Sequence, residues 1–297
     1  MTIDLKGRNA VVTGAGGGLG RSHALALARH GARVIVNDMS AAGAEAVAGE
    51  IRDAGGQAEA AACSVTDRTA VAAMIDGVVE RWGSIDILVN NAGILRDRTF
   101  ANLTLEDFEA VIDVHLMGSV ITTKAAWPHM RGQGYGRIVF TTSSSGLYGN
   151  FGQSNYSAAK MAVVGLMQTL ALEGDRHGIR VNCLAPSAST QMTAGLYSDE
   201  DLKGLSTDLV SPGVVALSAE SAPSRVILLA GAGAFEQAHV TMTRGVYLGD
   251  APDAAEQLQV RWSEIAARDG ETVPESGAAQ YNHEVRHPGR ARERTDA

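Results

Sequence analysis

Short apolar runs alternate with longer stretches of helical spacing along most of this chain. The apolar runs are nearly continuous, as strands are when helices cover both faces of a sheet. They predict β-strands at residues 9–13, 33–37, 58–65, 85–90, 137–142, 180–185, 225–230 and 239–243. The stretches between them repeat apolar positions every three or four residues. They predict α-helices at residues 20–30, 42–54, 67–82, 105–130 and 154–177.

This alternation of strands and helices predicts a fold class. Strand–helix–strand units cross over in the right-handed sense and build a parallel sheet. We therefore expect an α/β fold with a doubly wound parallel sheet, the Rossmann fold, as a single domain over residues 1–250. A C-terminal extension follows, with a helix within residues 251–273 and a polar, flexible tail over residues 274–297. The polar residues 198–213 predict a mobile lid.

The composition excludes several classes of function. Hydrophobic residues make up 45% of the 297 positions, and the formal net charge of -8 argues against nucleic-acid and anionic-membrane partners. Cys63 and Cys183 lie in apolar runs away from metal-ligand spacing, so we expect neither disulfides nor a metal site. The chain shows no secretory leader, no peroxisomal tripeptide and no apolar window long enough for a membrane span, so we expect a cytoplasmic protein.

A glycine-rich turn follows the first predicted strand directly. Residues 13–20 read Thr-Gly-Ala-Gly-Gly-Gly-Leu-Gly and lead into the first predicted helix. Glycines let the backbone approach a pyrophosphate, and the helix N-terminus offers N–H groups with a partial positive charge. We therefore assign dinucleotide binding to this turn, with Gly14, Gly18, Leu19 and Gly20 as contact residues.

Two further features lie at the carboxyl ends of predicted strands. Asp38 follows the glycines by about 20 residues, where a carboxylate bonds the adenosine ribose hydroxyls and repels the extra phosphate of NADP. This predicts NAD as the cofactor, although Arg21 nearby leaves the use of both coenzymes open. Residues 90–93 read Asn-Asn-Ala-Gly, and such small residues let a cofactor lie close. A plain turn is the alternative interpretation of that segment.

Tyr156 and Lys160 are four residues apart in a predicted helix, so their side chains share a face. A free phenol, with a pKa of about 10, is a poor general base at neutral pH. A lysine ammonium and the positive nicotinamide of an oxidised coenzyme favour the phenolate, which can take the proton of an alcohol as hydride leaves the same carbon. Ser143 ends the fifth predicted strand and can bond the substrate oxygen, as can Ser144 and Ser145.

These motifs together resemble the short-chain dehydrogenase/reductase family. The resemblance covers about residues 5–233, and the family's spacing of 13 positions between serine and tyrosine selects Ser143. It implies that an alcohol and a ketone are interconverted with NAD, and that Ser143, Tyr156 and Lys160 are catalytic. The cofactor contacts that it implies are Gly14, Gly18, Leu19, Gly20, Asp38, Ser64, Val65, Asn91, Ala92, Gly93, Tyr156, Lys160 and Thr190. Ser64 stands where the family commonly has an aspartate that bonds adenine.

A narrower resemblance appears in three segments. Residues 91–98, 114–116 and 146–160 are similar to the (3R)-hydroxyacyl-CoA dehydrogenase units of peroxisomal multifunctional enzymes type 2, also called 17β-hydroxysteroid dehydrogenases type 4. No hydratase or sterol-carrier domain follows here, so we expect a stand-alone dehydrogenase. His115 stands where most of the wider family has an asparagine that anchors a proton-relay water. An imidazole can hold such a water or simply pack within the helix.

The substrate is expected to be a (3R)-hydroxyacyl-CoA, with a hydroxysteroid or other bulky secondary alcohol as the alternative. Acyl-CoA phosphates need basic contacts, which Arg96 and Arg98 can supply unless they form a salt-bridged turn with Asp97. A steroid needs an apolar slot, for which the candidates are Leu147, Tyr148, Phe151, Met192, Leu196 and Tyr197. The resemblance also implies a homodimer or homotetramer, formed through residues 105–130 and 154–177. A non-catalytic NAD-binding protein on the same fold is the remote alternative.

Overall fold

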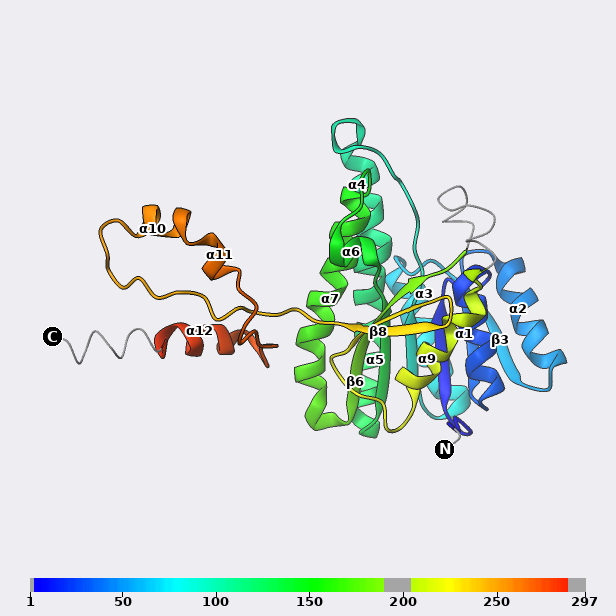
Figure 1. Ribbon diagram of the computed structural model, residues 1–297. Helices are drawn as coiled ribbons and strands as arrows, with labels where there is room; N and C mark the ends of the chain where they lie inside the picture. Colours follow the sequence, from blue (N-terminus) through cyan, green and yellow to red (C-terminus); the bar gives the residue numbers. More distant parts are fainter. Residues whose placement is uncertain (1–2, 190–203, 288–297) are drawn as a thin grey trace. The chain divides into compact units, whose positions relative to one another are not determined.

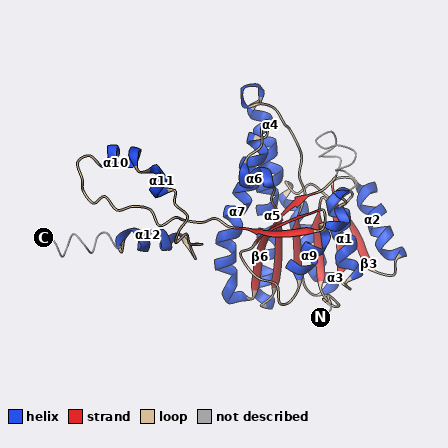
Figure 2. Ribbon diagram, viewed as in Figure 1, coloured by secondary structure: helices blue, strands red, loops and turns tan. Residues whose placement is uncertain are grey.

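A computed structural model describes residues 3–189 and 204–287 of the chain (Figure 1). The chain divides into two compact units, Met1–Ala238 and His239–Ala297. In the first unit eight strands form one sheet in the order β3-β2-β1-β4-β5-β6-β7-β8, with helices on both faces (Figure 2). Strands β1 to β7 run parallel, whereas β8 pairs with β7 in the antiparallel sense. The predicted doubly wound α/β sheet is therefore confirmed.

The strands begin and end close to the predicted positions, apart from the last. They are β1 (Asn9–Thr13), β2 (Arg33–Asp38), β3 (Gln57–Ala62), β4 (Ile87–Asn90), β5 (Gly136–Thr141), β6 (Ile179–Ser187), β7 (Ile227–Gly231) and β8 (Ala234–Ala238). The prediction of a strand at residues 239–243 was wrong, because Ala232 and Gly233 both adopt a positive φ and turn the chain back at once. Within residues 239–243, Met242 makes only an isolated bridge to Thr272.

Two layers of helices cover the sheet (Figure 1). Helices α1 (Gly18–Arg29), α2 (Ala41–Asp53) and α9 (Ser211–Ser218) bury their apolar side chains against one face. Helices α3 (Arg68–Trp82), α5 (Gly118–Gln133) and α7 (Ser154–Gly174) do so against the other. Strands β1, β4 and β5 are buried along their whole length, which explains their continuous apolar runs.

The predicted helix over residues 105–130 is interrupted. The structure has α4 (Leu105–Ile112), then a π-helical turn at Asp113–Met117, and then α5. A π-turn frees a backbone carbonyl from the regular ladder, and π-turns often occur at functional sites. Here the carbonyl of His115 accepts a hydrogen bond from the Ser119 hydroxyl at 2.7 Å. The interruption also brings the His115 side chain into the interior, where it is 2% exposed.

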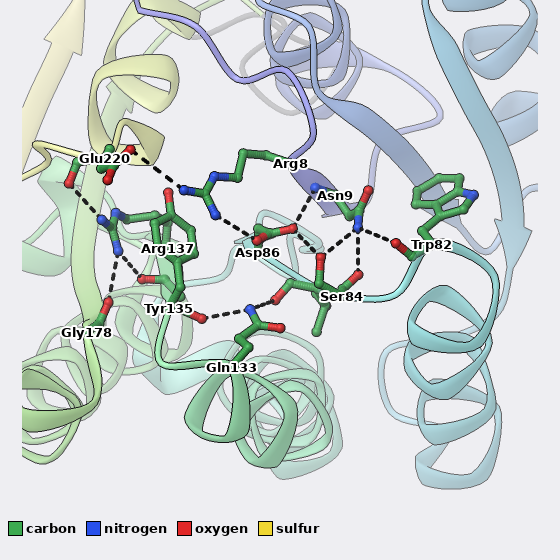
Figure 3. A network of polar contacts seen from close by, with 12 residues as sticks. Arg8, Asn9, Trp82, Ser84, Asp86, Gln133, Tyr135, Arg137, Gly178 and Glu220 are labelled. Carbon is green, nitrogen blue, oxygen red and sulfur yellow. Dashed lines mark hydrogen bonds and ion pairs between the residues drawn. The ribbon is translucent and has the colours of Figure 1, made fainter.

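A polar network ties together the amino ends of the central strands (Figure 3). Tyr135 lies between two guanidinium groups, with Arg8 at 3.6 Å and Arg137 at 4.1 Å from its ring centroid. Arg8 also pairs with Asp86 at 3.1 Å. Arg137 is 4% exposed, and it donates to backbone carbonyls of Gly136, Gly178, Ala219 and Glu220. Polar side chains thus fill this end of the sheet, and a cavity lies at the carboxyl ends of the strands.

The second unit contains the helices α10 (Ala254–Val260), α11 (Trp262–Ile265) and α12 (Gly277–Val285). The single helix predicted over residues 254–268 is thus two short ones, and α12 lies within the stretch expected to be a polar, flexible tail. None of the described residues 239–287 is buried. No helix among the described residues is long and apolar enough to cross a membrane.

Candidate active site

A cavity of about 710 Å³ opens at the carboxyl ends of β1, β4, β5 and β6. The structure brings most of the predicted site residues together in its lining. These are Gly14, Gly18, Leu19, Gly20, Asp38, Asn91, Ala92, Gly93, Ser143, Tyr156 and Lys160. Thr190 and the first part of the predicted lid, residues 198–203, lie outside the described residues.

The glycine turn is tight enough to exclude side chains. A Cβ on Gly14, whose φ is +61°, would lie 2.7 Å from the Cα of Ala92. A Cβ on Gly20 would lie 2.1 Å from the carbonyl oxygen of Gly14. Helix α1 begins at Gly18 with no side-chain cap from Gly17. The N-terminus of α1 can therefore face an anionic ligand, as binding of a pyrophosphate requires.

Asp38 at the end of β2 faces this turn. One carboxylate oxygen accepts the Gly16 amide at 2.9 Å, and the other accepts the Ser40 amide at 2.9 Å. The half-buried carboxylate is thus held at the rim of the cavity. Arg21, which left the coenzyme prediction open, pairs with Glu50 of α2, and its Nε donates to that carboxylate at 3.0 Å.

Asn91 joins the glycine turn to the loop after β4. Its side-chain amide donates to the carbonyl oxygens of Thr13 at 3.1 Å and Gly14 at 3.2 Å. The Thr13 hydroxyl accepts the backbone N–H groups of Asn91 and Ala92 in return, at 3.0 and 3.1 Å. These bonds give residues 91–93 a defined place beside the turn.

Ser64 and Val65 are not among the residues that line the cavity. Val65 is 6% exposed and packs against the start of α5, where a Cβ on Gly118 would lie 2.5 Å from its Cγ2. The Ser64 hydroxyl bonds that of Thr66 at 2.8 Å. Both residues follow β3, next to β2 in the sheet, so only their position near Asp38 supports a coenzyme contact.

Three polar side chains meet at the ends of β5 and α7. Lys160 is 4% exposed, and its ammonium donates to the Thr141 carbonyl at 2.6 Å. The same ammonium lies 5.5 Å from the centroid of the Tyr156 ring. Ser143 follows β5, and its hydroxyl accepts the Ser145 amide at 3.2 Å. The two competing serines differ from it, because Ser145 donates its hydroxyl to Gln153 at 2.8 Å and Ser144 begins helix α6 (Ser144–Tyr148).

The sequence matches the short-chain dehydrogenase family over residues 8–201, which is more than half of its length. The chain belongs to this family. Its members are oxidoreductases that use a nicotinamide coenzyme and act on small molecules. The predicted family resemblance is confirmed.

Individual relatives of this short-chain dehydrogenase agree with the narrower resemblance. It is 43% identical over 272 residues to the peroxisomal multifunctional enzyme type 2 of Drosophila melanogaster, covering 87% of this chain and 45% of the fly protein. It is 41% identical over 248 residues to the hydroxyacyl-CoA dehydrogenase ChsB1 of Mycobacterium tuberculosis, covering 79% and 76%. The crystal structure of a short-chain dehydrogenase from Mycobacterium avium matches with a TM-score of 0.79 at 38% identity, covering 89% and 96%. The chain spans less than half of the fly enzyme's length.

The pKa values of Tyr156 and Lys160 in this dehydrogenase differ from those that the sequence led us to expect. Burial raises the pKa of the Tyr156 phenol, the Asp97 charge adds to this, and hydrogen bonding from Ser143 counters it. Burial also lowers the pKa of Lys160 to about 7, so its ammonium is only partly charged at neutral pH. Without a bound coenzyme, the desolvation of the phenol therefore outweighs the help expected from the lysine.

His115 of this dehydrogenase is clamped to the loop after β4. Its Nε2 lies 3.0 Å from the amide nitrogen and 2.8 Å from the carbonyl oxygen of Ile94. Its ring meets that of Tyr156 edge-on at 5.2 Å, and burial lowers its pKa to about 3, so the imidazole is neutral. Its Nδ1 is buried and has no hydrogen-bond partner among the described residues. The ring both packs within the helix and keeps a polar atom that can bond a further group.

Sequence reasoning missed two polar residues of the site. Gln153 lines the cavity, is 6% exposed, and donates to the Asp97 carboxylate at 2.6 Å. Asn155 is fully buried and donates to the Arg96 carbonyl at 3.0 Å. Asn155 directly precedes Tyr156 and Gln153 stands three positions before it, so amide side chains close to the candidate tyrosine were the available signal.

The predicted salt-bridged turn among Arg96, Asp97 and Arg98 was wrong. Arg96 pairs instead with Asp107 of α4, at 3.3 Å. A side-chain nitrogen of Arg98 donates to the backbone carbonyl of Asp97 at 3.1 Å. The loop runs alongside the start of α7, because the Arg98 amide donates to the Gly152 carbonyl at 3.0 Å. Neither arginine therefore forms an ion pair with the Asp97 carboxylate in this loop.

Proposed function

We propose that this dehydrogenase interconverts a secondary alcohol and a ketone with NAD, using Ser143, Tyr156 and Lys160 as catalytic residues. The observation that carries the proposal is that these three side chains share one cavity with the glycine turn and Asp38. The turn suits a pyrophosphate and Asp38 a ribose, which leaves the three polar groups at the reacting end. A non-catalytic coenzyme-binding protein would have no need for all three.

The chemistry then divides between coenzyme and chain. The nicotinamide ring, when bound, accepts or returns a hydride. Ser143 bonds the substrate oxygen, and the Tyr156 hydroxyl exchanges a proton with that same oxygen. Because burial raises the pKa of the phenol, Tyr156 begins as the acid that a ketone reduction needs. Alcohol oxidation needs the phenolate, which positive charge at the site favours.

A preference for NAD over NADP is part of the proposal. The Asp38 carboxylate stands at the end of β2, where it would bond ribose hydroxyls and repel a ribose phosphate. The ion pair between Arg21 and Glu50 supports this preference, because it engages the guanidinium that could otherwise attract the ribose phosphate of NADP. Asn91, Ala92 and Gly93 complete the proposed coenzyme contacts, with Thr190 as the proposed partner of the nicotinamide amide.

We propose a (3R)-hydroxyacyl-CoA as the substrate class. The fly relative and the mycobacterial hydroxyacyl-CoA dehydrogenase support this by their names and by identities above 40%. Tyr148 lines the cavity and is 68% exposed, so its ring is available to contact an acyl chain. The same ring suits the alternative, a hydroxysteroid.

Replacing Tyr156 with Phe tests the proposed chemistry. We expect Y156F to lower the turnover of alcohol and ketone by about 10³-fold, because the only proton-exchanging group at the substrate oxygen is lost. Coenzyme binding, measured by fluorescence titration, should stay close to that of the wild type. The matched control is Y135F, which also removes a tyrosine hydroxyl, but at the amino ends of the strands, away from the cavity. A fully active Y156F would refute the assignment.

A substrate panel separates the proposed class from its alternative. Reduction of NAD and of NADP is followed spectrophotometrically with (3R)- and (3S)-hydroxyacyl-CoAs of several chain lengths and with steroid alcohols. We expect the highest kcat/KM with NAD and a (3R)-hydroxyacyl-CoA. A higher kcat/KM with a steroid alcohol would favour the hydroxysteroid function, and equal use of NADP would contradict the role given to Asp38.

A homodimer or homotetramer in the cytoplasm completes the proposal. Met161 and Leu172 lie on the outer face of α7 and are 42% and 51% exposed. Eleven residues separate them, about three helical turns, so they share a face that a second copy would cover. Sedimentation of the full chain tests the oligomeric state.

A further inference from the structure

Asp97 lies in the loop after β4 and presents a carboxylate to the start of α7. One of its oxygens, Oδ2, accepts the side-chain amide of Gln153 at 2.6 Å. The other, Oδ1, is buried and has no hydrogen-bond partner among the described residues. Buried carboxylate oxygens are normally paired, because taking a charge out of water is costly. This oxygen therefore needs an explanation.

No cation within the described parts of the chain forms an ion pair with this carboxylate. Arg96 pairs with Asp107 instead. The Arg98 guanidinium bonds the backbone carbonyl of Asp97 rather than its side chain. The negative charge of Asp97 is thus left uncompensated beside the cavity.

The hydrogen bonds of Gln153 connect this charge to the active site. Its Oε1 accepts the Ser145 hydroxyl at 2.8 Å and the Asn150 side-chain amide at 3.0 Å. Its Nε2 donates to Asp97, which fixes which end of the amide points to which partner. Gln153 is the N-cap of α7 and Tyr156 lies in its first turn, and both residues line the cavity.

Four polar groups lie around Tyr156, and two of them, Ser143 and Asp97, act on the pKa of its hydroxyl. Lys160 lies on its own helix, neutral His115 in the π-helical turn, and Ser143 after β5. Asp97, in the loop after β4, is the one carboxylate among them. Its charge adds to the effect of burial in raising the pKa of the phenol. A negative neighbour disfavours a phenolate, so it opposes loss of the tyrosine proton.

We propose that Asp97 is a positioning residue that orients the Gln153 amide and helps to hold the proton on Tyr156, so that its charge raises the pH at which ketone reduction gives way to alcohol oxidation. The inference rests on the proposed function. In reduction the coenzyme delivers a hydride to the carbonyl carbon while the Tyr156 hydroxyl gives its proton to the oxygen. In oxidation both transfers run backwards, and the phenolate must be present first.

The test compares pH profiles of D97N with those of the wild type in both directions. Asn removes the charge and keeps an oxygen that can accept from Gln153. We expect the acid limb of alcohol oxidation and the alkaline limb of ketone reduction both to move to lower pH, with a several-fold gain in oxidation below the wild-type limb. The control E106Q removes one exposed carboxylate at the start of α4 and should leave both limbs in place.

A second variant separates the charge from the hydrogen bond. D97A removes both, so we expect the same shift of the limbs together with a rise in KM, since Gln153 loses its acceptor. Thermal unfolding confirms that each variant is folded. If D97N and the wild type share the same limbs while both are active, the inference is overturned and the proposed function stands.

The effect of Asp97 on Tyr156 can also be measured directly, without any enzymatic turnover. If the wild type turns over no alcohol or ketone, the phenols are titrated by NMR with tyrosine labelled at the ζ carbon. The chain has 6 tyrosines, and Y156F identifies the signal of Tyr156. A lower titration midpoint in D97N supports the role of Asp97, and the absence of such a lowering contradicts it.

Discussion

Asp38 is the residue whose contacts bear most directly on the choice of coenzyme. Its two carboxylate oxygens accept the amides of Gly16 and Ser40, so the side chain is oriented before any ligand arrives. A Cβ on Gly16 would lie 2.9 Å from the Asp38 carboxyl carbon, which keeps turn and carboxylate in direct contact. Pre-oriented groups lose little conformational entropy on binding.

Replacing Asp38 with Ala should weaken the binding of NAD and reduce the preference for NAD over NADP. We expect KM for NAD to rise about tenfold, which corresponds to the loss of one charge-assisted hydrogen bond. Steady-state kinetics with both coenzymes measure the change. D53A removes an exposed carboxylate at the end of α2 and serves as the control. An unchanged ratio of the two kcat/KM values in D38A would remove Asp38 from the account of specificity.

Some of these residues could be predicted from the sequence and others could not. Ser143, Tyr156 and Lys160 stand in short motifs at the ends of predicted elements, so local spacing was enough to select them. The contact of Asp97 with Gln153 spans 56 positions and depends on the path of the loop after β4. Helical or strand periodicity contains no information about that path, and local charge pattern wrongly paired Asp97 with its neighbouring arginines.

Elements were predictable where burial has a regular period. Strands β1 and β5 are wholly buried and were found within a residue or two, because an apolar run bounded by glycines or polar residues is specific. The π-helical turn at Asp113–Met117 was missed, because one extra residue in a turn barely changes the apolar pattern. The last strand was expected at residues 239–243 instead of at β8, since all five residues of Ala234–Ala238 lack full burial.

The packing of α1 on α9 predicts a pH-dependent stability. His23 of α1 is fully buried, its Nδ1 lies 2.9 Å from the Ser211 hydroxyl, and burial lowers its pKa to about 3. The unfolded chain binds a proton below its ordinary pKa of 6.5 and the folded chain does not, so stability falls as the pH drops from about 6.5 towards 3. His115 contributes in the same window and the same direction.

H23Q should remove the share of this loss that belongs to His23. Glutamine can still bond Ser211 and does not titrate, so we expect the fall in unfolding free energy between about pH 7.5 and pH 5 to be smaller by about 2 kcal/mol. Urea unfolding at a series of pH values measures it. H30Q, at the C-cap of the same helix, serves as the matched histidine-to-glutamine control. An H23Q profile parallel to that of the wild type would show that His23 takes up its proton in the folded chain too, and so does not cause the loss of stability.

At the scale of the whole molecule, the residues that stabilise the fold and those proposed to carry the reaction lie at opposite ends of the parallel strands. The Arg137 network closes the amino ends of the strands (Figure 3), and the cavity lies at their carboxyl ends. Strand β5 links the two, since Arg137 stands near its start and Ser143 just after its end. A strand of this length spans about 20 Å, and no charge at the amino ends of the strands is among the causes of the Tyr156 pKa shift. A change at one edge should therefore reach the other only by altering the fold.

R137M makes this separation testable. Four backbone carbonyls would each lose one donor, the nearly buried Arg137 guanidinium, so we expect the free energy of unfolding to fall by about 3 kcal/mol. R131M, at an exposed position at the end of α5, should cost less than about 0.5 kcal/mol. At a temperature where R137M is still folded, kcat/KM and its pH limbs should equal those of the wild type. A shifted limb in folded R137M would mean that the charge network at the amino edge acts on Tyr156 across the sheet, and the two edges would have to be treated as one electrostatic system.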